Sequence, residues 1–332
     1  IIVGAIYSKR NKDVNDFYLG GRKLGPIVTA MSAEASDMSS WLLMGLPGVA
    51  YLSGCAEAGW TAIGLAIGTY LNWLIVAKRL RRYTHKANNS ITLPAFFSNR
   101  YRDKSHALLA IAAIMIVIFF VPYTASGFAA CGKLFATLFH VPYLPAMIIS
   151  AVVIVLYTTL GGFLAASMTD LIQSIIMTIA LVIVVFYGIY AAGGLDAVIA
   201  NANSMDGYLS MMFSHDAVSN TAVPYKGLTI ASTLAWGLGY FGMPHILLRF
   251  MGIEDENKLT TSRRIASVWV VISMFIAIFI GIIGSAMTKA GAIEVLEGSS
   301  QAETLIVRTA MLLSNHGFLT IVLAGLILAG IL

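Results

Sequence analysis

The chain is 332 residues long, and 58% of its residues are hydrophobic while only 11% are charged. Soluble globular domains carry about 25% charged residues, so a mean hydropathy of +0.82 excludes an ordinary water-soluble domain. The formal net charge of +5 does not indicate a nucleic-acid partner, because the basic residues follow the pattern of a membrane protein.

Long apolar runs predict membrane-spanning helices. A bilayer core about 30 Å thick requires about 20 mostly apolar helical residues, and a lipid-exposed helix satisfies its own backbone hydrogen bonds. Strands of a membrane β-barrel would be about 10 residues long and strictly alternating, which these runs are not. We therefore predict an all-α polytopic membrane protein whose full-length spans are 27–50, 56–77, 107–138, 143–166, 171–192, 227–248 and 266–288.

Two further apolar runs are short, at residues 1–7 and 317–332. The first has no charged start of the kind a signal peptide carries, so 1–7 is interpreted as the end of a first helix. The second is still apolar at Leu332. We expect residues 1–332 to form a single transmembrane-domain fragment that is truncated at both ends.

The distribution of basic residues predicts the orientation. Of the 21 Lys and Arg residues, 17 lie in three segments, with five in 8–26, eight in 78–106 and four in 249–264. These segments fall on one face if the predicted helices alternate in direction, and the positive-inside rule makes that face cytoplasmic. The basic run 78–82 is expected to contact anionic membrane lipid.

Polar residues interrupt the span 27–50. Residues 32–41 contain Glu34 and Asp37 among small and hydroxylated residues, and Pro47 follows. A carboxylate near the membrane centre costs at least about 2.5 kcal/mol on insertion scales, so we do not expect Asp37 to face lipid unpaired. The composition favours a locally unwound backbone that offers oxygen atoms to a cation. The structural alternative is that Asp37 caps the unwound helix or pairs with a basic residue.

The span 227–248 is interrupted by three glycines and a proline in residues 236–245, which weaken a helix. Trp236 and Tyr240 are four residues apart, so we expect them to share one helical face, and from the residues alone we interpret them as packing aromatics. The same stretch matches G-x-G-x-x-G, but it follows no strand and is not a dinucleotide-binding motif.

The two interrupted spans lie five helices apart. Transporters built from inverted repeats place broken helices at corresponding positions of their two halves. We therefore predict that 27–192 is the first five-helix repeat and that 227–332 is the start of the second. A further polar position, Asp170, either takes part in ion binding or caps the helix that begins at Leu171.

Enzymatic activity is not predicted. The sequence shows no serine–histidine–acid or cysteine–histidine set with a supporting fold, and no phosphate-binding loop follows a strand. The six histidines have no metal-ligand spacing.

Several motifs together resemble the sodium/solute symporter family, and within it the bacterial members that carry proline. The similarity runs in order along essentially the whole chain. The motifs are LGGRKLGP at 19–26, SDMSSWLLMGLPG at 36–48, TTLGGFLA at 158–165, SMTD at 167–170 and WGLGYFGMPH at 236–245.

The resemblance implies a LeuT-like inverted-repeat fold with one extra helix ahead of two five-helix repeats. It implies a first sodium site between the second and ninth helices, with backbone carbonyls of Ala35, Met38 and Gly330 as ligands. Two hydroxyl ligands expected just after Gly330 fall beyond the chain. Asp37 matches a critical carboxylate of the family, and Asp170 matches a second acidic position tied to sodium.

The resemblance also implies a substrate pocket for L-proline. Two residues depart from the family pattern, because Glu34 stands where a small residue is expected and Met243 where glutamine is usual. The positions that match those associated with the pocket are Ser39, Trp41, Tyr123, Trp236, Tyr240 and Pro244.

The expected function is secondary active symport of Na⁺ and L-proline into the cell by alternating access. The expected location is the inner membrane of a bacterium. One alternative is a family member that carries another organic solute, such as sialic acid, pantothenate or a sugar. Another is the membrane sensor portion of a signalling protein, and a passive channel is the weakest.

Overall fold

The computed structural model describes residues 6, 13–217 and 219–331, except for the side chain of Ser39. Apart from Ile6, the predicted helix end at 1–7 lies outside these residues. The described chain is predominantly helical, as predicted, with one short antiparallel hairpin formed by β1 (Phe213–Asp216) and β2 (Thr221–Pro224).

The helices follow one another closely along the chain. The first group is α2 (Val14–Leu19), η1 (Gly20–Arg22), α3 (Pro26–Ser40), η2 (Trp41–Gly45), α4 (Leu46–Ser53), α5 (Cys55–Asn72), η3 (Trp73–Ala77), α6 (Lys78–Lys86), α7 (Leu93–Tyr101), α8 (Ala107–Phe139), α9 (Tyr143–Ala191) and α10 (Leu195–Asn203). After the hairpin come α11 (Gly227–Leu234), η4 (Ala235–Gly242), α12 (Pro244–Gly252), η5 (Glu256–Lys258), α13 (Leu259–Lys289), α14 (Gly298–Ala302), α15 (Leu305–Ser314) and α16 (Phe318–Ile331).

Within the described residues, four helical stretches are long and apolar enough to cross a membrane, namely Cys55–Lys86, Ala107–Phe139, Tyr143–Ala191 and Glu256–Lys289. The prediction of seven spans differs from this number for two reasons. The spans 27–50 and 227–248 are divided into shorter helical pieces, and α9 contains two predicted spans within 49 residues. The apolar side chains along the first half of α8 are exposed, as a lipid-facing helix requires.

The predicted unwinding around Asp37 is wrong, because the backbone stays helical from α3 through α4. The irregularity is the π-helical turn η2, which begins at Trp41 and is flanked by helical φ/ψ angles at Ser40 and Leu46. A change from i→i+4 to i→i+5 hydrogen bonding inserts one residue into the helix, and such turns are frequent at functional sites. The polar segment therefore perturbs the helix without breaking it.

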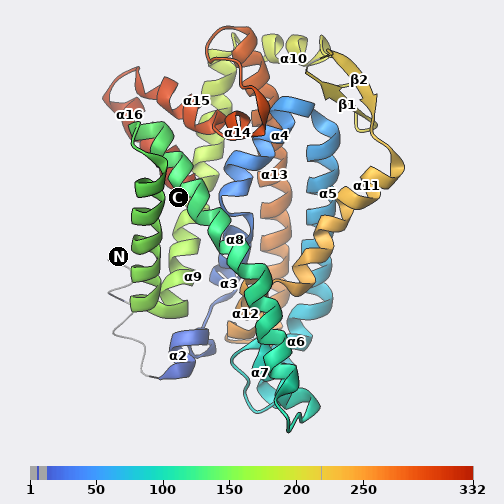
Figure 1. Cartoon of the computed structure of the whole chain (residues 1–332), viewed down its shortest axis with the longest axis vertical. Helices are drawn as coiled ribbons and strands as arrows, with labels where there is room; N and C mark the ends of the chain where they lie inside the picture. The colour runs from blue at the N-terminus through green and yellow to red at the C-terminus, as the bar shows by residue number, and fades with distance from the viewer. Residues whose placement is uncertain (1–5, 7–12, 218, 332) are drawn as a thin grey trace.

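The reversal inside α9 is made by one glycine. Gly162 has φ 63° and ψ −161°, a conformation that is essentially restricted to glycine. In Figure 1 the first part of α9 descends to the end of the molecule that holds α2, and the second part returns toward α10. Asp170 lies within the returning helix, so the alternative that it caps a helix starting at Leu171 is wrong.

The break predicted in span 227–248 is present at Met243, which has φ −79° and ψ 108° between η4 and α12. The residues before it form a 3₁₀ helix with about three residues per turn. Trp236 and Tyr240 therefore point in different directions, with Trp236 56% exposed and Tyr240 2% exposed. The prediction that they share one helical face is wrong for this reason.

Glycines allow η4 to approach α5 closely. A Cβ atom added to Gly68 would collide with the backbone of Gly237, and one added to Gly237 would collide with the backbone of Gly64. The two helices are consequently in backbone contact. This contact fixes η4, and with it Tyr240, against the middle of the molecule.

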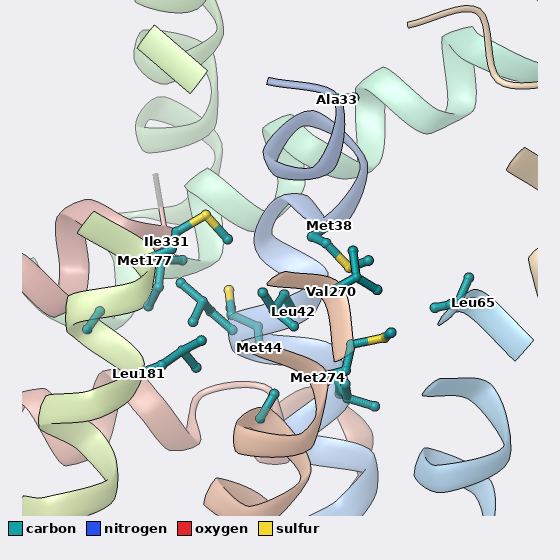
Figure 2. Packing of buried hydrophobic residues seen from close by; sticks show 14 of the residues in the cluster. Ala33, Met38, Leu42, Met44, Leu65, Met177, Leu181, Val270, Met274 and Ile331 are labelled. Carbon is teal, nitrogen blue, oxygen red and sulfur yellow. The ribbon is translucent and has the colours of Figure 1, made fainter. Parts of the chain in front are cut away.

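The apolar core lies where α3, η2, the returning half of α9 and α13 meet. Figure 2 shows Leu42 and Met44 between Met177 and Leu181 on one side and Met274 on the other, with Met38 directed toward Val270. These side chains are buried. The core therefore holds the segment around Asp37 in a fixed position between two long helices.

The basic segments meet at the end of the molecule that holds α2, α6 and α7 (Figure 1). Arg81 donates to the carbonyl of Ile253 at 2.8 Å, and Arg82 pairs with Glu256 at 2.6 Å. Arg22 donates to the carbonyls of Met251 and Ser90, and burial together with the nearby Arg81 lowers the pKa of Arg22 to about 10. The shared cytoplasmic face predicted for these segments is consistent with this arrangement.

Candidate functional site

Asp37 lies at the centre of a group of side chains contributed by α3, α8, η4 and α12. Its side chain is only 6% exposed, and its Oδ1 is 4.0 Å from Nε2 of His245. The Tyr240 hydroxyl also faces the Asp37 carboxylate. Among the residues that the structure describes, no Lys or Arg lies within salt-bridge distance of Asp37, so the alternative that it pairs with such a residue is not supported.

Two aromatic contacts join the segments that carry Asp37 and His245 to neighbouring helices. The rings of Trp41 and Trp236 have centroids 5.9 Å apart, and the ring of Tyr123 stacks on His245 at 5.4 Å. The Tyr123 hydroxyl lies 3.5 Å from the carbonyl oxygens of Ser36 and of Asp37. Since Tyr123 is on α8 and the carbonyls are on α3, this contact joins the two helices beside Asp37.

The substrate positions implied by the resemblance fall into two contacting groups. Tyr123 and Tyr240 lie beside Asp37, and Trp41 contacts Trp236. Pro244 begins α12 next to His245. Ser39 lies in the last turn of α3, but its side chain is outside the described part of the structure. Trp236 forms an exposed edge of the group, and Tyr240 forms its buried floor.

Arg249 is a candidate functional residue that the sequence does not reveal. Its position in 249–264 predicts a solvent-facing basic residue, but this is wrong, because Arg249 lies in α12 and is 6% exposed. Its Nη2 is 2.7 Å from Oδ2 of Asp170 and 2.9 Å from the hydroxyl oxygen of Ser36. Its Nε donates to Ser32, which in turn donates to Asp170 at 2.7 Å.

This network, which we term the Arg249 clamp (Arg249, Asp170, Ser32 and Ser36), connects three helices. Ser32 and Ser36 are on α3, Asp170 is on α9 and Arg249 is on α12. A buried ion pair that is also hydrogen-bonded holds its partners in one geometry. Two sequence signals could have indicated the Arg249 clamp. One is an arginine inside an apolar helix, five residues after Pro244, and the other is Asp170, an acid that requires a partner of opposite charge.

Glu34 is the second buried acid of α3. It is 3% exposed, and its Oε1 accepts a hydrogen bond of 2.9 Å from the indole Nε1 of Trp73. The Trp73 ring packs on Phe250 of α12 with centroids 4.4 Å apart. The burial of Glu34 and its hydrogen bond to Trp73 exclude an orientation in which the carboxylate extends to the membrane surface.

The positions implied for the first sodium site lie on α3 and α16. Ala35 and Met38 are buried in the wound helix, and the Met38 carbonyl accepts a hydrogen bond from the Trp41 backbone N–H. Gly330 packs against Met177, Ala180 and Leu43. A carbonyl oxygen has two lone pairs, so the Met38 carbonyl retains one for a cation.

No group of three or more His, Cys, Asp or Glu side chains suited to a metal ion is found among the described residues. A transition-metal centre is therefore not indicated in that part of the chain. Oxygen atoms of single carboxylates, hydroxyls and carbonyls are the ligands offered around Asp37, and such ligands suit hard cations.

Comparison with known proteins gives consistent matches. Residues 17–332 match the model of the sodium:solute symporter family. The chain is 40% identical over 340 residues to the sodium/proline symporter of Escherichia coli, covering 100% of this chain and 63% of that protein. It is 42% identical over 286 residues to the osmoregulated proline transporter OpuE of Bacillus subtilis, covering 86% of this chain and 56% of that protein.

A third relative, the high-affinity proline transporter PutP of Bacillus subtilis, is 43% identical over 286 residues, which cover 86% of this chain and 58% of that protein. The chain therefore spans roughly three fifths of the length of these relatives. Among solved structures, a Na⁺-coupled sialic acid symporter in its substrate-bound, outward-open state matches with a TM-score of 0.77 at 16% identity, covering 99% of this chain and 66% of that one. This match confirms the predicted LeuT-like fold.

Proposed function

The chain belongs to the sodium:solute symporter family, and from this we propose that the full-length protein carries L-proline into the cell together with Na⁺. The observation that carries the proposal is the 40% identity, over the whole chain, to a protein named as a sodium/proline symporter. The relatives matched here are transporters and not enzymes. We place the protein in the inner membrane of a bacterium, which it crosses several times.

The proposed sodium ligands are the carbonyls of Ala35, Met38 and Gly330, with Asp37 and Asp170 as the nearby acids. Intramembrane acids are costly unless they have a partner or a function, and Asp37 has no Lys or Arg partner among the described residues. A bound Na⁺ would stabilise its carboxylate. This supports a role for Asp37 in ion coupling rather than in helix capping alone.

Proline is proposed to bind on the exposed side of Asp37. The paired rings of Trp41 and Trp236 offer an apolar surface that suits a pyrrolidine ring. Ser39, Tyr123, Tyr240 and Pro244 complete the proposed pocket. Because binding of the two solutes is thermodynamically linked, Na⁺ raises the affinity for proline by the same factor as proline raises the affinity for Na⁺.

Alternating access requires one group of helices to move relative to another around the bound solutes. We propose that 27–192 and the part of the chain from 227 onward correspond to the first repeat and the start of the second. The Arg249 clamp joins α3 and α12 to α9 across this division. Its contacts must therefore change if these helices separate on the cytoplasmic side.

The proposal is tested with the full-length protein in proteoliposomes that carry an inward Na⁺ gradient. We expect accumulation of radiolabelled L-proline that stops when Na⁺ is replaced by choline and that is lost in Asp37→Asn. Glu57→Gln is the matched control, because Glu57 is an exposed acid in the first turn of α5. Uptake that is independent of Na⁺, or that survives Asp37→Asn unchanged, would refute the proposal.

A second candidate is symport of a different organic solute. Two observations favour it. The fold is shared with a sialic acid symporter, and Met243 stands where glutamine is usual, at the break between η4 and α12. Competition of sialic acid, pantothenate and sugars against proline uptake distinguishes the candidates. A competitor that binds more tightly than proline would identify the true substrate class.

A further inference from the structure

An apolar groove runs along α13, where this helix meets the returning half of α9 and the first half of α3. Its volume is about 500 Å³, within the range of about 300–1,000 Å³ that is typical of small-molecule sites. Because α9 and α13 pack directly on one another, the groove is a crevice between two neighbouring helices. The apolar residues that line it include Met31, Leu181, Ile265, Val268, Ile272 and Ile276.

One end of the groove is positively charged. Arg264 lines it there, and its side chain is exposed and has no ion pair or hydrogen bond with the described residues. Other basic residues near this end of α13 have partners. Arg263 lies over the ring of Tyr70, 5.3 Å from its centroid, and Lys258 pairs with an acid four residues before it at 2.6 Å. Arg264 is therefore available to an anion at the mouth of the groove.

The groove has the depth of one membrane leaflet. Arg264 and Ile276 are 12 residues apart, which corresponds to about 18 Å along a helix, and half of a bilayer core is about 15 Å. Ile276 lies near the middle of α13, one of the helices long and apolar enough to cross a membrane. The groove thus leads from the membrane surface to the membrane centre, as the acyl chain of a lipid does.

Trp269 joins α13 to α9 within the groove. Its indole Nε1 donates to the hydroxyl of Thr178 at 3.0 Å, so the ring can present its apolar surface to a chain of methylene groups. Tryptophan is enriched at the level of the lipid headgroups, and Trp269 is five residues, or about 7.5 Å, from Arg264. The outer rim is apolar and open, because Val268 and Ile272 are 59% and 53% exposed.

We propose that this groove binds an anionic phospholipid, with one acyl chain between α9 and α13 and the phosphate paired with Arg264. Burial of the chain supplies affinity, and the contact between guanidinium and phosphate supplies the preference for an anionic headgroup. A membrane-spanning helix seated in the same place would bring apolar residues against an arginine that has no acidic partner. The charge at the mouth therefore favours a lipid over a helix.

The site has a consequence for conformational change. Met31 lies on α3, the helix that carries Asp37, so movement of α3 alters one wall of the groove. A ligand shifts an equilibrium only by its difference in affinity for the two states, and the bound lipid favours the conformation in which Met31 lines the groove. This consequence rests on the proposed transport, whereas the binding itself requires only that the chain lies in a membrane.

The test is lipid binding to the purified full-length protein after delipidation in detergent. Native mass spectrometry gives the dissociation constants of dioleoylphosphatidylglycerol and of dioleoylphosphatidylcholine, which has the same acyl chains. We expect tighter binding of phosphatidylglycerol, and we expect Arg264→Gln to weaken it by about fivefold without changing the affinity for phosphatidylcholine. Arg79→Gln is the matched control, because Arg79 is another exposed cation at this end of the molecule.

A second pair of variants tests the acyl-chain part of the site. Val268→Trp fills the groove and should weaken the binding of both lipids by at least about tenfold, which corresponds to about two displaced methylene groups. Val271→Trp is its control, because Val271 is on the same helix and is 53% exposed but does not line the groove. Phosphatidylglycerol with a diazirine in its acyl chain should label residues within 264–276 of the wild-type protein.

The outcomes separate this site from the proposed transport. Equal affinity of the wild type for the two lipids, equal effects of the two glutamine variants, or equal effects of the two tryptophan variants overturns the site. Labelling confined to other parts of the protein does the same, and a helix that follows residue 332 or a second copy in the groove would produce that result. The expected lipid binding in a protein that does not take up proline would support the site and refute the transport.

Discussion

The Arg249 clamp makes a quantitative prediction about stability. We consider Arg249→Met, which keeps most of the side-chain length and removes the guanidinium. The substitution leaves Asp170 and the hydroxyls of Ser32 and Ser36 without their donor in a buried position. In Na⁺-free buffer no bound cation takes the place of the lost charge.

The magnitude follows from the burial of the pair. The side chains of Arg249 and Asp170 are 7% and 17% exposed, and their closest atoms are 2.7 Å apart. Removing one partner of a buried ion pair costs about 3–5 kcal/mol, because the other charge remains buried and uncompensated. We expect a loss of unfolding free energy in this range, and a smaller loss when Asp170→Asn is combined with Arg249→Met.

The assay is denaturant unfolding of the purified full-length protein in detergent, followed by circular dichroism. The matched control is Arg82→Met, which breaks an ion pair of nearly equal length, 2.6 Å, whose side chains are 48% and 29% exposed. Exposed pairs contribute little, so the control should lose only a small fraction of what Arg249→Met loses. Equal losses of unfolding free energy in the two variants would show that burial does not determine how much the Arg249 clamp stabilises the protein, and this would refute the prediction.

Three further changes test other features. Gly162→Ala should lower the unfolding free energy by about 1–3 kcal/mol, because alanine is strained at the φ and ψ angles of Gly162. The control Gly325→Ala lies in open space on α16 and should have little effect. Equal unfolding midpoints in the two variants would contradict this. Gly68→Ala should cost about 1–3 kcal/mol through overpacking against Gly237, measured in the same way, and a neutral result would mean that the helices separate readily. In Na⁺-free buffer Tyr240→Phe should lower the Tm, since it removes the buried hydroxyl that faces the Asp37 carboxylate; an unchanged Tm would refute this.

Local composition predicts much of the fold. The break at Met243 is predictable because three glycines and a proline remove helix propensity over a few residues. The orientation of the chain in the membrane stays a prediction from the distribution of lysine and arginine. Asp37 is identifiable as a candidate site residue because an acid within a membrane span is costly wherever it lies. These inferences depend on the chemistry of short segments only.

The parts that could not be predicted depend on contacts between distant segments. Arg249 and Asp170 are 79 residues apart, and only the packing of α12 against α3 and α9 makes them partners. The 3₁₀ geometry of η4 separates Trp236 from Tyr240. The glycines of 235–242 indicate a weak helix, but they do not predict which helical geometry forms where η4 meets α5. The partner of Glu34 could not be predicted either, because Trp73, which donates a hydrogen bond to it, is 39 residues away in the sequence.

The π-helical turn η2 changes the angular phase of the helix that carries Asp37. One inserted residue rotates every following side chain by about 100° relative to an uninterrupted α-helix. The face of α4 that packs on α13 through Pro47 and Ala50 is thus out of step with the face of α3 that carries Glu34 and Asp37. A single-residue deletion within 41–45 would restore ideal α-helical winding but would turn the packing face of α4 away from α13. The number of residues in this turn therefore matters more than their identity.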